Sequence, residues 1–96
     1  MVQNIVTLEK LNAYFLITSQ ALDKAKVAFD SLRQTQAEDF FMMASSYFKD
    51  ARYFADIKED YVVAFAALNY AHGWLDAGAR IGLFQVKDSR LFTVDE

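Results

Sequence analysis

The side chains in this sequence that could do chemistry gather on one predicted helix, the last of three. Asn69, His72, Asp76 and Arg80 recur at spacings of three, four and four residues, so they share one face of that helix. His72 and Asp76 are one turn apart, which is the spacing that two metal ligands use on a helix. Asp50 on the preceding helix is expected to lie at the height of Asn69. These five residues could therefore bind a metal ion, an anion or another small ligand.

A structural role is the alternative for the same five residues. Asp76 and Arg80 fit an exposed ion pair, which contributes about 0.3–0.5 kcal/mol. Asn69 and His72 could instead cap or solvate an interface. A lone histidine among helical residues is more often satisfied locally than bound to a metal, so we expect no metal and no cofactor here.

Motifs of known enzyme classes are missing from the sequence. It has no Glu-x-x-His pair of the kind found in di-iron bundles, no glycine-rich phosphate loop and no His-Glu-x-x-His metalloprotease helix. A nucleophilic triad would need His72, the only histidine, to meet Ser45, Ser46 or Thr18. Nothing in the spacing favours that, and the Thr18 hydroxyl can bond back to the carbonyl four residues earlier. We therefore expect no catalytic activity.

Two long helices are predicted before the one that carries the polar row. In the first, over about residues 5–32, apolar residues recur at alternating spacings of three and four. They are Leu8, Leu11, Phe15, Thr18 as the one polar member, Leu22, Ala25, Phe29 and Leu32. The second helix, over about residues 36–58, alternates small and aromatic residues. It begins near Thr35 and Glu38, which have the spacing of a capping box.

The last helix, over about residues 61–83, follows Asp60, whose carboxylate is a good N-cap. A helical wheel places small residues and one large ring toward the other two helices: Ala64, Ala67, Ala71, Trp74 and Gly78. Because three helices of similar length are joined by short loops, we predict an all-α, antiparallel up-down-up bundle. Residues 1–96 would form a single domain. Residues 85–96 would be a short C-terminal tail that docks on the bundle, binds a partner or frays.

The sequence contains more apolar residues than three helices can bury against one another. Some share the face of the polar row on the last helix, and others lie off the seam of the first helix. We predict that they form an interface, covered by a second copy of the chain in a homodimer or by another protein. The predicted interface residues are Tyr14, Leu16, Ile17, Val62, Phe65 and Leu83. The two hypotheses for function are thus an interaction module and, as the alternative, a small-ligand or metal-binding domain.

Composition limits the class of protein further. Apolar residues make up 54% and charged residues 24% of the chain, which is too apolar for a disordered segment. A net charge of -3 offers no basic surface for nucleic acid, so we expect no nucleic-acid partner. The absence of cysteine and of a long apolar span favours a cytoplasmic protein that is not in a membrane.

Residues 47–84, YFKDARYFADIKEDYVVAFAALNYAHGWLDAGARIGLF, resemble the archaeal "domain of unknown function 357" family. The similarity is carried by the DARYF segment, the acidic-aromatic pair Asp60-Tyr61 and the run that ends in NYAHGWLDAG. The resemblance implies a compact, all-helical archaeal domain in the cytoplasm, found alone or appended to domains such as nucleotidyltransferase-like ones. It implies no settled activity, so the function stays open.

Overall fold

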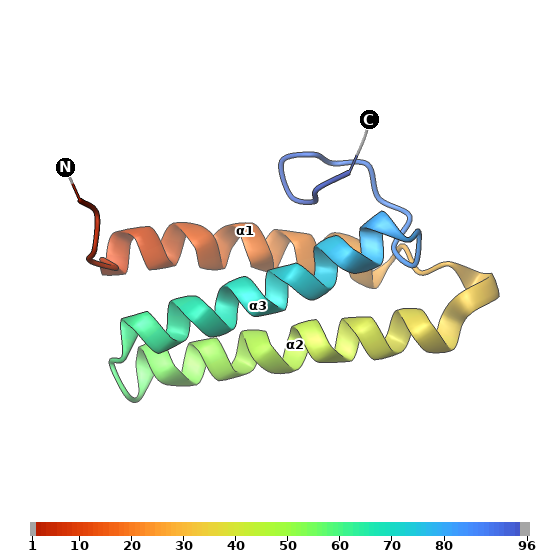
Figure 1. Ribbon diagram of the computed structural model, residues 1–96. Coiled ribbons are helices and arrows are strands. Elements are labelled where there is room, and N and C mark those ends of the chain that lie inside the picture. The colour runs from red at the N-terminus through yellow and green to blue at the C-terminus, as the bar shows by residue number, and fades with distance from the viewer. Residues whose placement is uncertain (1, 95–96) are drawn as a thin grey trace.

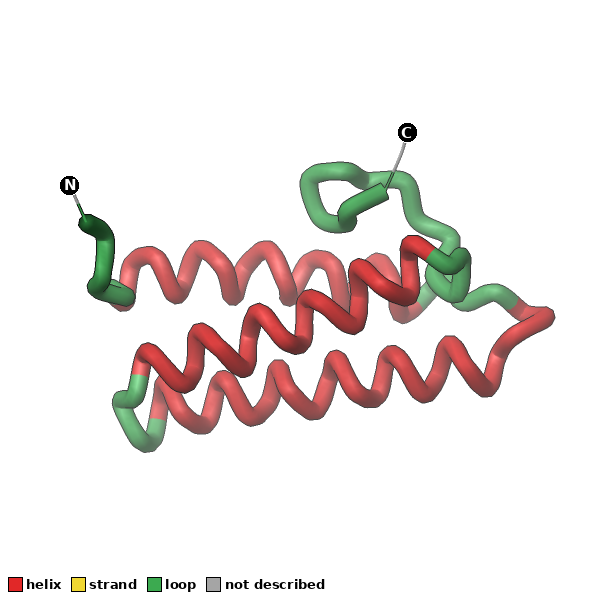
Figure 2. The backbone as a smooth tube through the Cα atoms, viewed as in Figure 1, coloured by secondary structure: helices red, strands yellow, loops and turns green. Residues whose placement is uncertain are grey.

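Three helices run up, down and up in the computed structural model, which describes residues 2–94 (Figure 1). α1 spans Leu8–Lys26, α2 spans Gln34–Asp56 and α3 spans Tyr61–Arg80, and a short 3-10 turn, η1, spans Ser31–Arg33 before α2. Helices and loops make up the described chain (Figure 2), so the predicted all-α fold is confirmed. No helix within residues 2–94 is long and apolar enough to cross a membrane.

The bundle is flat, with extents of 43 × 28 × 17 Å. Its shape follows from the way α3 packs, since α3 contacts α2 most extensively and α1 less, while α1 and α2 contact each other least. α3 therefore has one face against its two neighbours and the opposite face open. The flanks of that open face carry two hollows, one beside α1 and one beside α2.

Side-chain caps explain where two of the helices begin. The Thr7 hydroxyl accepts a hydrogen bond from the Lys10 amide at 3.1 Å and starts α1. The Asp60 carboxylate accepts one from the Val63 amide at 3.1 Å and starts α3, as predicted. α2 differs, because it begins at Gln34 and its N-cap residue makes no side-chain cap bond. The predicted capping box of Thr35 and Glu38 is thus wrong, and the 3-10 turn leads directly into the helix.

α1 ends at Lys26, earlier than its apolar period predicts, because the following segment pairs with the chain after α3. The Asp30 amide donates to the Leu83 carbonyl at 2.9 Å, and the Gln85 amide donates to the Ala28 carbonyl at 2.7 Å. This short antiparallel bridge brings the Phe29 and Phe84 rings to 5.7 Å. The helical spacing of Phe29 therefore reflects burial in an extended segment, and the apparent seam residue Leu32 is 92% exposed.

α3 ends at Arg80, and the turn after it reverses the chain into the core. Gly82 has a φ of 78°, a left-handed conformation that residues with a side chain rarely adopt. The Leu83 amide then bonds to the Gly78 carbonyl at 2.8 Å. The prediction that Leu83 lies at an exposed interface is wrong, because this turn directs its side chain inward and leaves it 1% exposed.

The core consists of two clusters of buried residues within the described chain. Alanines of α2 lie in both, and let α1 and α3 approach that helix closely. The cluster near the start of α1 holds Leu11, Phe15, Ala51, Ala55, Ala64 and Leu68. The cluster near the end of α3 holds Ala21, Ala25, Ala37, Ala44, Leu75, Ala79, Leu83, Phe84, Leu91 and Phe92. On α3, Ala64, Ala71 and Gly78 are buried as predicted, whereas Ala67 and Trp74 are partly exposed.

The tail folds back over the end of the bundle between α1 and α3 (Figure 1). Leu91 and Phe92 are buried in the same cluster as residues of all three helices. The tail is therefore part of the core, and its docking determines the surroundings of the polar row on α3.

Candidate functional site

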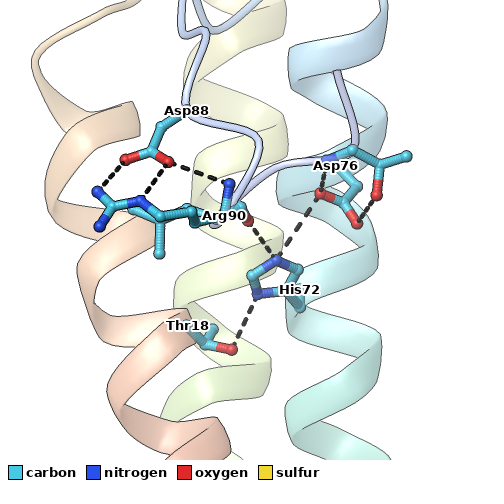
Figure 3. Close-up of polar contacts among 7 residues, drawn as sticks. Thr18, His72, Asp76, Asp88 and Arg90 are labelled. Carbon is cyan, nitrogen blue, oxygen red and sulfur yellow. Dashed lines mark hydrogen bonds and ion pairs between the residues drawn. The ribbon is translucent and has the colours of Figure 1, made fainter. Parts of the chain in front are cut away.

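His72 lies between α1 and the tail and bonds to both (Figure 3). Its Nδ1 atom is 3.0 Å from the Thr18 hydroxyl, and its Nε2 atom is 2.6 Å from the Leu91 carbonyl oxygen. Since a carbonyl oxygen only accepts, Nε2 carries the hydrogen and donates to Leu91. In the neutral ring Nδ1 then accepts from the Thr18 hydroxyl. His72 thus joins α1, α3 and the tail.

Asp76, one turn further along α3, also bonds to the tail. Its Oδ1 atom accepts from the Thr93 amide at 2.9 Å, and its Oδ2 atom accepts from the Thr93 hydroxyl at 3.1 Å. The same carboxylate lies 3.7 Å from His72 Nε2. His72 and Asp76, one turn apart on α3, therefore both bond to the tail, which is a segment of the chain itself.

Asp88 makes a further polar contact between the tail and α1. Its carboxylate lies 3.1 Å from Lys24 Nζ and 2.9 Å from Arg90 Nη2. The hydrogen bond from Arg90, and then that from Lys24, hold the pKa of Asp88 well below its ordinary value of 3.8. Because the pKa is lower in the folded state, the unfolded chain takes up a proton first as the pH falls. The contribution of Asp88 to stability is therefore fully present above pH 3.8 and is lost in more acidic solution.

Of the other three residues of the predicted polar site, Asn69 lies with His72 and Asp76, and the other two do not. Asn69 is exposed and lines the same hollow between α1 and α3 as His72 and Asp76. Arg80 lines a different hollow, beside Val86 and Lys87 of the tail. Asp50 is exposed on α2 and lines neither hollow. Within residues 2–94 no group of three or more His, Cys, Asp or Glu side chains could hold a metal ion.

The contact between Thr18 and His72 is the feature that sequence reasoning missed. The spacing did not favour this pair, and the Thr18 hydroxyl was expected to bond within its own helix. A hydroxyl that donates to a histidine is the arrangement of an activated nucleophile. Here Thr18 is only 2% exposed, and the second ring nitrogen of His72 is bonded to Leu91. The pair therefore connects packed segments, and the one polar residue on the α1 seam was the signal that could have found it.

Replacing His72 with alanine should lower the free energy of unfolding by about 1–2 kcal/mol. The Thr18 hydroxyl and the Leu91 carbonyl would lose their partner, and unpaired buried polar groups are destabilising. Urea unfolding measures the loss, and amide hydrogen exchange at Thr93 should become faster as the tail loosens. Asn69→Ala, an exposed change on the same helix, is the control. An equal loss in both variants, or unchanged exchange at Thr93, would contradict this role.

The predicted interface residues separate into different surroundings. Tyr14 and Ile17 of α1 line a hollow of about 230 Å³ with Asn69 and Gly73 of α3. The Tyr14 ring also packs edge-to-face on Phe65, with centroids 5.1 Å apart. Four of the six predicted residues are exposed, namely Tyr14, Leu16, Ile17 and Val62, and Phe65 is partly buried. Leu16 does not line this hollow, because successive residues of a helix point about 100° apart.

Aromatic side chains form a second hollow, on the α2 flank of α3. Phe40, Tyr70 and Trp74 line it with Gly73 and Ala77, and its volume is about 300 Å³. The wheel placed Trp74 against the other helices, whereas its ring is only partly buried at the edge of the contact with α2. Sequence reasoning therefore assigned this ring to the core when it also forms part of the surface.

Comparison with known proteins gives one match, to a family model described as "Protein of unknown function (DUF357)". The model matches residues 13–84, which run from α1 to the buried Phe84 and leave out the tail. No curated protein and no solved structure matches the chain. The comparison therefore supports the family predicted from the NYAHGWLDAG run and its neighbours.

Proposed function

This chain belongs to the DUF357 family, whose description assigns no function, and we propose from its geometry that it is a protein-interaction module. In this proposal the module self-associates through a surface that we call the α1–α3 face. The α1–α3 face consists of Tyr14, Ile17, Val62, Phe65 and Asn69. The partner is a second copy of the chain, and the module has no catalytic activity.

The observation that supports this proposal most is that the tail covers only one half of the junction between α1 and α3. The covered half holds His72 and Asp76, whose polar atoms bond to the tail and whose side chains line the same hollow as Tyr14 and Ile17 of the other half. The other half is the α1–α3 face, where Val62 is 67% and Ile17 is 38% exposed. Apolar side chains that line a hollow next to an intramolecular docking site favour a further docked segment.

The exposed area supports a dimer. The chain exposes 6352 Å² to solvent. A compact monomer of 11.0 kDa exposes roughly 5,600 Å². The excess of roughly 700 Å² is close to the area that each partner buries in a standard protein interface, about 800 Å². The flat shape of the bundle accounts for the excess, and a second copy against the α1–α3 face would remove much of it.

The alternative of a small-ligand or metal site has less support from the geometry. His72 and Asp76 already bond to the tail, and of the other predicted residues only Asn69 lines a hollow with them, whereas Asp50 and Arg80 do not. The absence of cysteine from the sequence suits a reducing compartment, so the proposal places the module in the cytoplasm. The archaeal origin in this proposal is what the family resemblance implies.

Light scattering on the purified chain tests self-association, with twice 11.0 kDa as the expected mass. Ile17→Glu should weaken association at least about tenfold, because it places a charge in a desolvated interface. Leu16→Glu is the matched control, since Leu16 is 60% exposed on the same helix but points away from the α1–α3 face. We expect this control variant to associate like the wild type.

Val62→Glu is a second test, in case Ile17→Glu weakens association only by disturbing the fold. Val62 lies on α3 and is more exposed than Ile17, so its substitution should disturb the fold less. It should weaken association while circular dichroism shows an unchanged melting curve. A wild-type chain that stays monomeric at all concentrations would refute self-association. Dissociation by Leu16→Glu but not by Ile17→Glu or Val62→Glu would refute the choice of face.

A further inference from the structure

The aromatic hollow on the α2 flank of α3 shares Gly73 with the hollow beside the α1–α3 face, but its other lining residues are different. Its five lining residues, Phe40, Tyr70, Gly73, Trp74 and Ala77, carry no charge. Gly73 keeps the hollow open, since a Cβ atom added there would meet no heavy atom within 4 Å. Tyr70 is 53% exposed, so its ring forms a wall of the hollow and is not part of the core.

In this hollow the Phe40 ring and the Tyr70 ring each stand at right angles to the Trp74 ring. The Trp74 and Phe40 centroids are 5.0 Å apart with an interplanar angle of 89°. The Tyr70 and Trp74 centroids are 6.4 Å apart, also at 89°. The Tyr47 ring packs edge-to-face on the Tyr70 ring, with ring centroids 4.5 Å apart. Perpendicular rings around one space resemble the aromatic cages that surround a rounded organic cation.

The charges around the hollow favour a cation as well. Asp39 and Asp50 are exposed on α2. They lie on the helical stripe next to the one that holds Phe40. Arg80, the cation one turn beyond Ala77, lines the hollow beside the tail instead. Within residues 2–94 the cation–π contacts lie on other rings, with Arg52 over Phe15 and Lys58 near Tyr53. A positive ligand would therefore meet aromatic rings in the hollow itself, with two carboxylates on the neighbouring stripe of α2.

We propose that this hollow, the Phe40–Tyr70–Trp74 cage, binds a quaternary ammonium group. Each ring face attracts a cation through its quadrupole, and several faces around one space add their attraction. A lysine ammonium carries three N–H donors that need acceptors, and the lining offers mainly ring faces and a glycine surface. A quaternary nitrogen has no N–H group and leaves no donor unsatisfied. The group could come from a free small molecule such as choline or from a trimethylated lysine side chain.

Trp74 is the only tryptophan in the sequence, so its fluorescence reports on the cage directly. Titration with choline chloride, against sodium chloride at equal ionic strength, should give a saturable change with a dissociation constant of about 1–10 mM. The neutral control is 3,3-dimethylbutan-1-ol, which has the shape of choline with carbon in place of nitrogen. We expect it to bind at least about fivefold more weakly. A parallel titration with acetylated trimethyl-lysine amide distinguishes the two sources of the group.

Tyr70→Leu should weaken binding at least about fivefold, because it removes one wall and leaves Trp74 in place as the reporter. Tyr53→Leu is the matched control, since Tyr53 is 47% exposed on α2 and packs on Phe54, away from the cage. Asp50→Asn should weaken binding about twofold at low salt and less at high salt. Ile17→Glu should bind like the wild type, so this proposal stands or falls independently of self-association.

Saturable binding of either cation, lost in Tyr70→Leu and kept in Tyr53→Leu, would support the cage. No saturable change with choline or with the trimethyl-lysine amide would overturn it. Equal binding of 3,3-dimethylbutan-1-ol would also overturn it, because the hollow would then recognise shape and apolar surface without charge. An equal loss in Tyr70→Leu and Tyr53→Leu would place the binding elsewhere.

Discussion

Replacing Phe92 with alanine is expected to lower the free energy of unfolding by about 3–5 kcal/mol, the largest effect of any change considered for this chain. Phe92 is 2% exposed and lies in the cluster that includes residues of all three helices. Removal of the ring would leave a cavity that the backbone of the tail cannot fill. Since a small domain is stable by about 5–15 kcal/mol, the loss would be a large part of the total. Urea unfolding followed by circular dichroism measures it.

Leu32→Ala is the control for Phe92→Ala, because Leu32 is 92% exposed and its truncation should change stability by less than about 0.5 kcal/mol. A loss below about 1 kcal/mol for Phe92→Ala would show that the tail docks weakly and is not part of the cooperative core. The family model matches residues 13–84. The expected result would therefore mean that this chain depends for its stability on a segment outside the matched region.

Gly78→Ala and Gly73→Ala are expected to change stability in opposite directions, although both replace a glycine in α3. A Cβ atom at Gly78 would overlap the Phe84 ring, with the Cδ2 atom only 2.6 Å away. Phe84 is fully buried and has no room to move, so overpacking should cost about 2–3 kcal/mol. At Gly73 the added atom meets nothing within 4 Å. The better helix propensity of alanine should then stabilise the chain by about 0.5–1 kcal/mol.

Thermal and urea unfolding of the two glycine variants, measured side by side, provide the comparison. Each variant is the control for the other, because the chemical change and the helix are the same. Destabilisation by both would mean that the open face of α3 is covered in solution near Gly73. Stabilisation by both would mean that Phe84 leaves the position that it has against Gly78 in this structure.

The bundle could be predicted from the sequence because its signals are local. Asp60 caps α3 through a bond to a residue three positions later, and the alanines of α2 recur at helical spacing. Both signals depend on short stretches of chain, in which residues close in the sequence decide whether a helix forms. The family resemblance likewise came from contiguous segments of α2 and α3, and the match to residues 13–84 supports it.

Most of the wrong predictions concern residues whose burial or partner depends on a turn or on a distant segment of the chain. Phe29 fits the period of α1, yet it pairs with Phe84 across the molecule. Leu83 fits an exposed face of a longer helix, yet the turn at Gly82 directs it inward. The Thr18 hydroxyl has a local acceptor available, yet it bonds to His72. Helical periodicity reports that a residue is buried or exposed on average, and it does not report which distant segment buries it.

The polar row shows the same limit. His72 and Asp76 lie on one face with one turn between them, as their spacing predicts, and that spacing fits both a structural role and metal or ligand binding. The structure provides Leu91 and Thr93 as their partners, and neither residue type nor distance along the chain identified them. A docked tail satisfies a polar row as well as a ligand does, and only the three-dimensional arrangement distinguishes the two cases.

The chain of bonds from Thr18 through His72 to Leu91 also constrains the order in which the molecule assembles. Its two links span 54 and 19 residues of sequence. By contrast, α2 and α3 are joined by a tight turn, and their contact closes only a short loop. Closing a longer loop costs more chain entropy. By this loop-closure argument the hairpin of α2 and α3 forms at the lowest entropic cost, the tail closes onto α3 at a somewhat higher cost, and α1, whose link is the longest, joins at the highest cost.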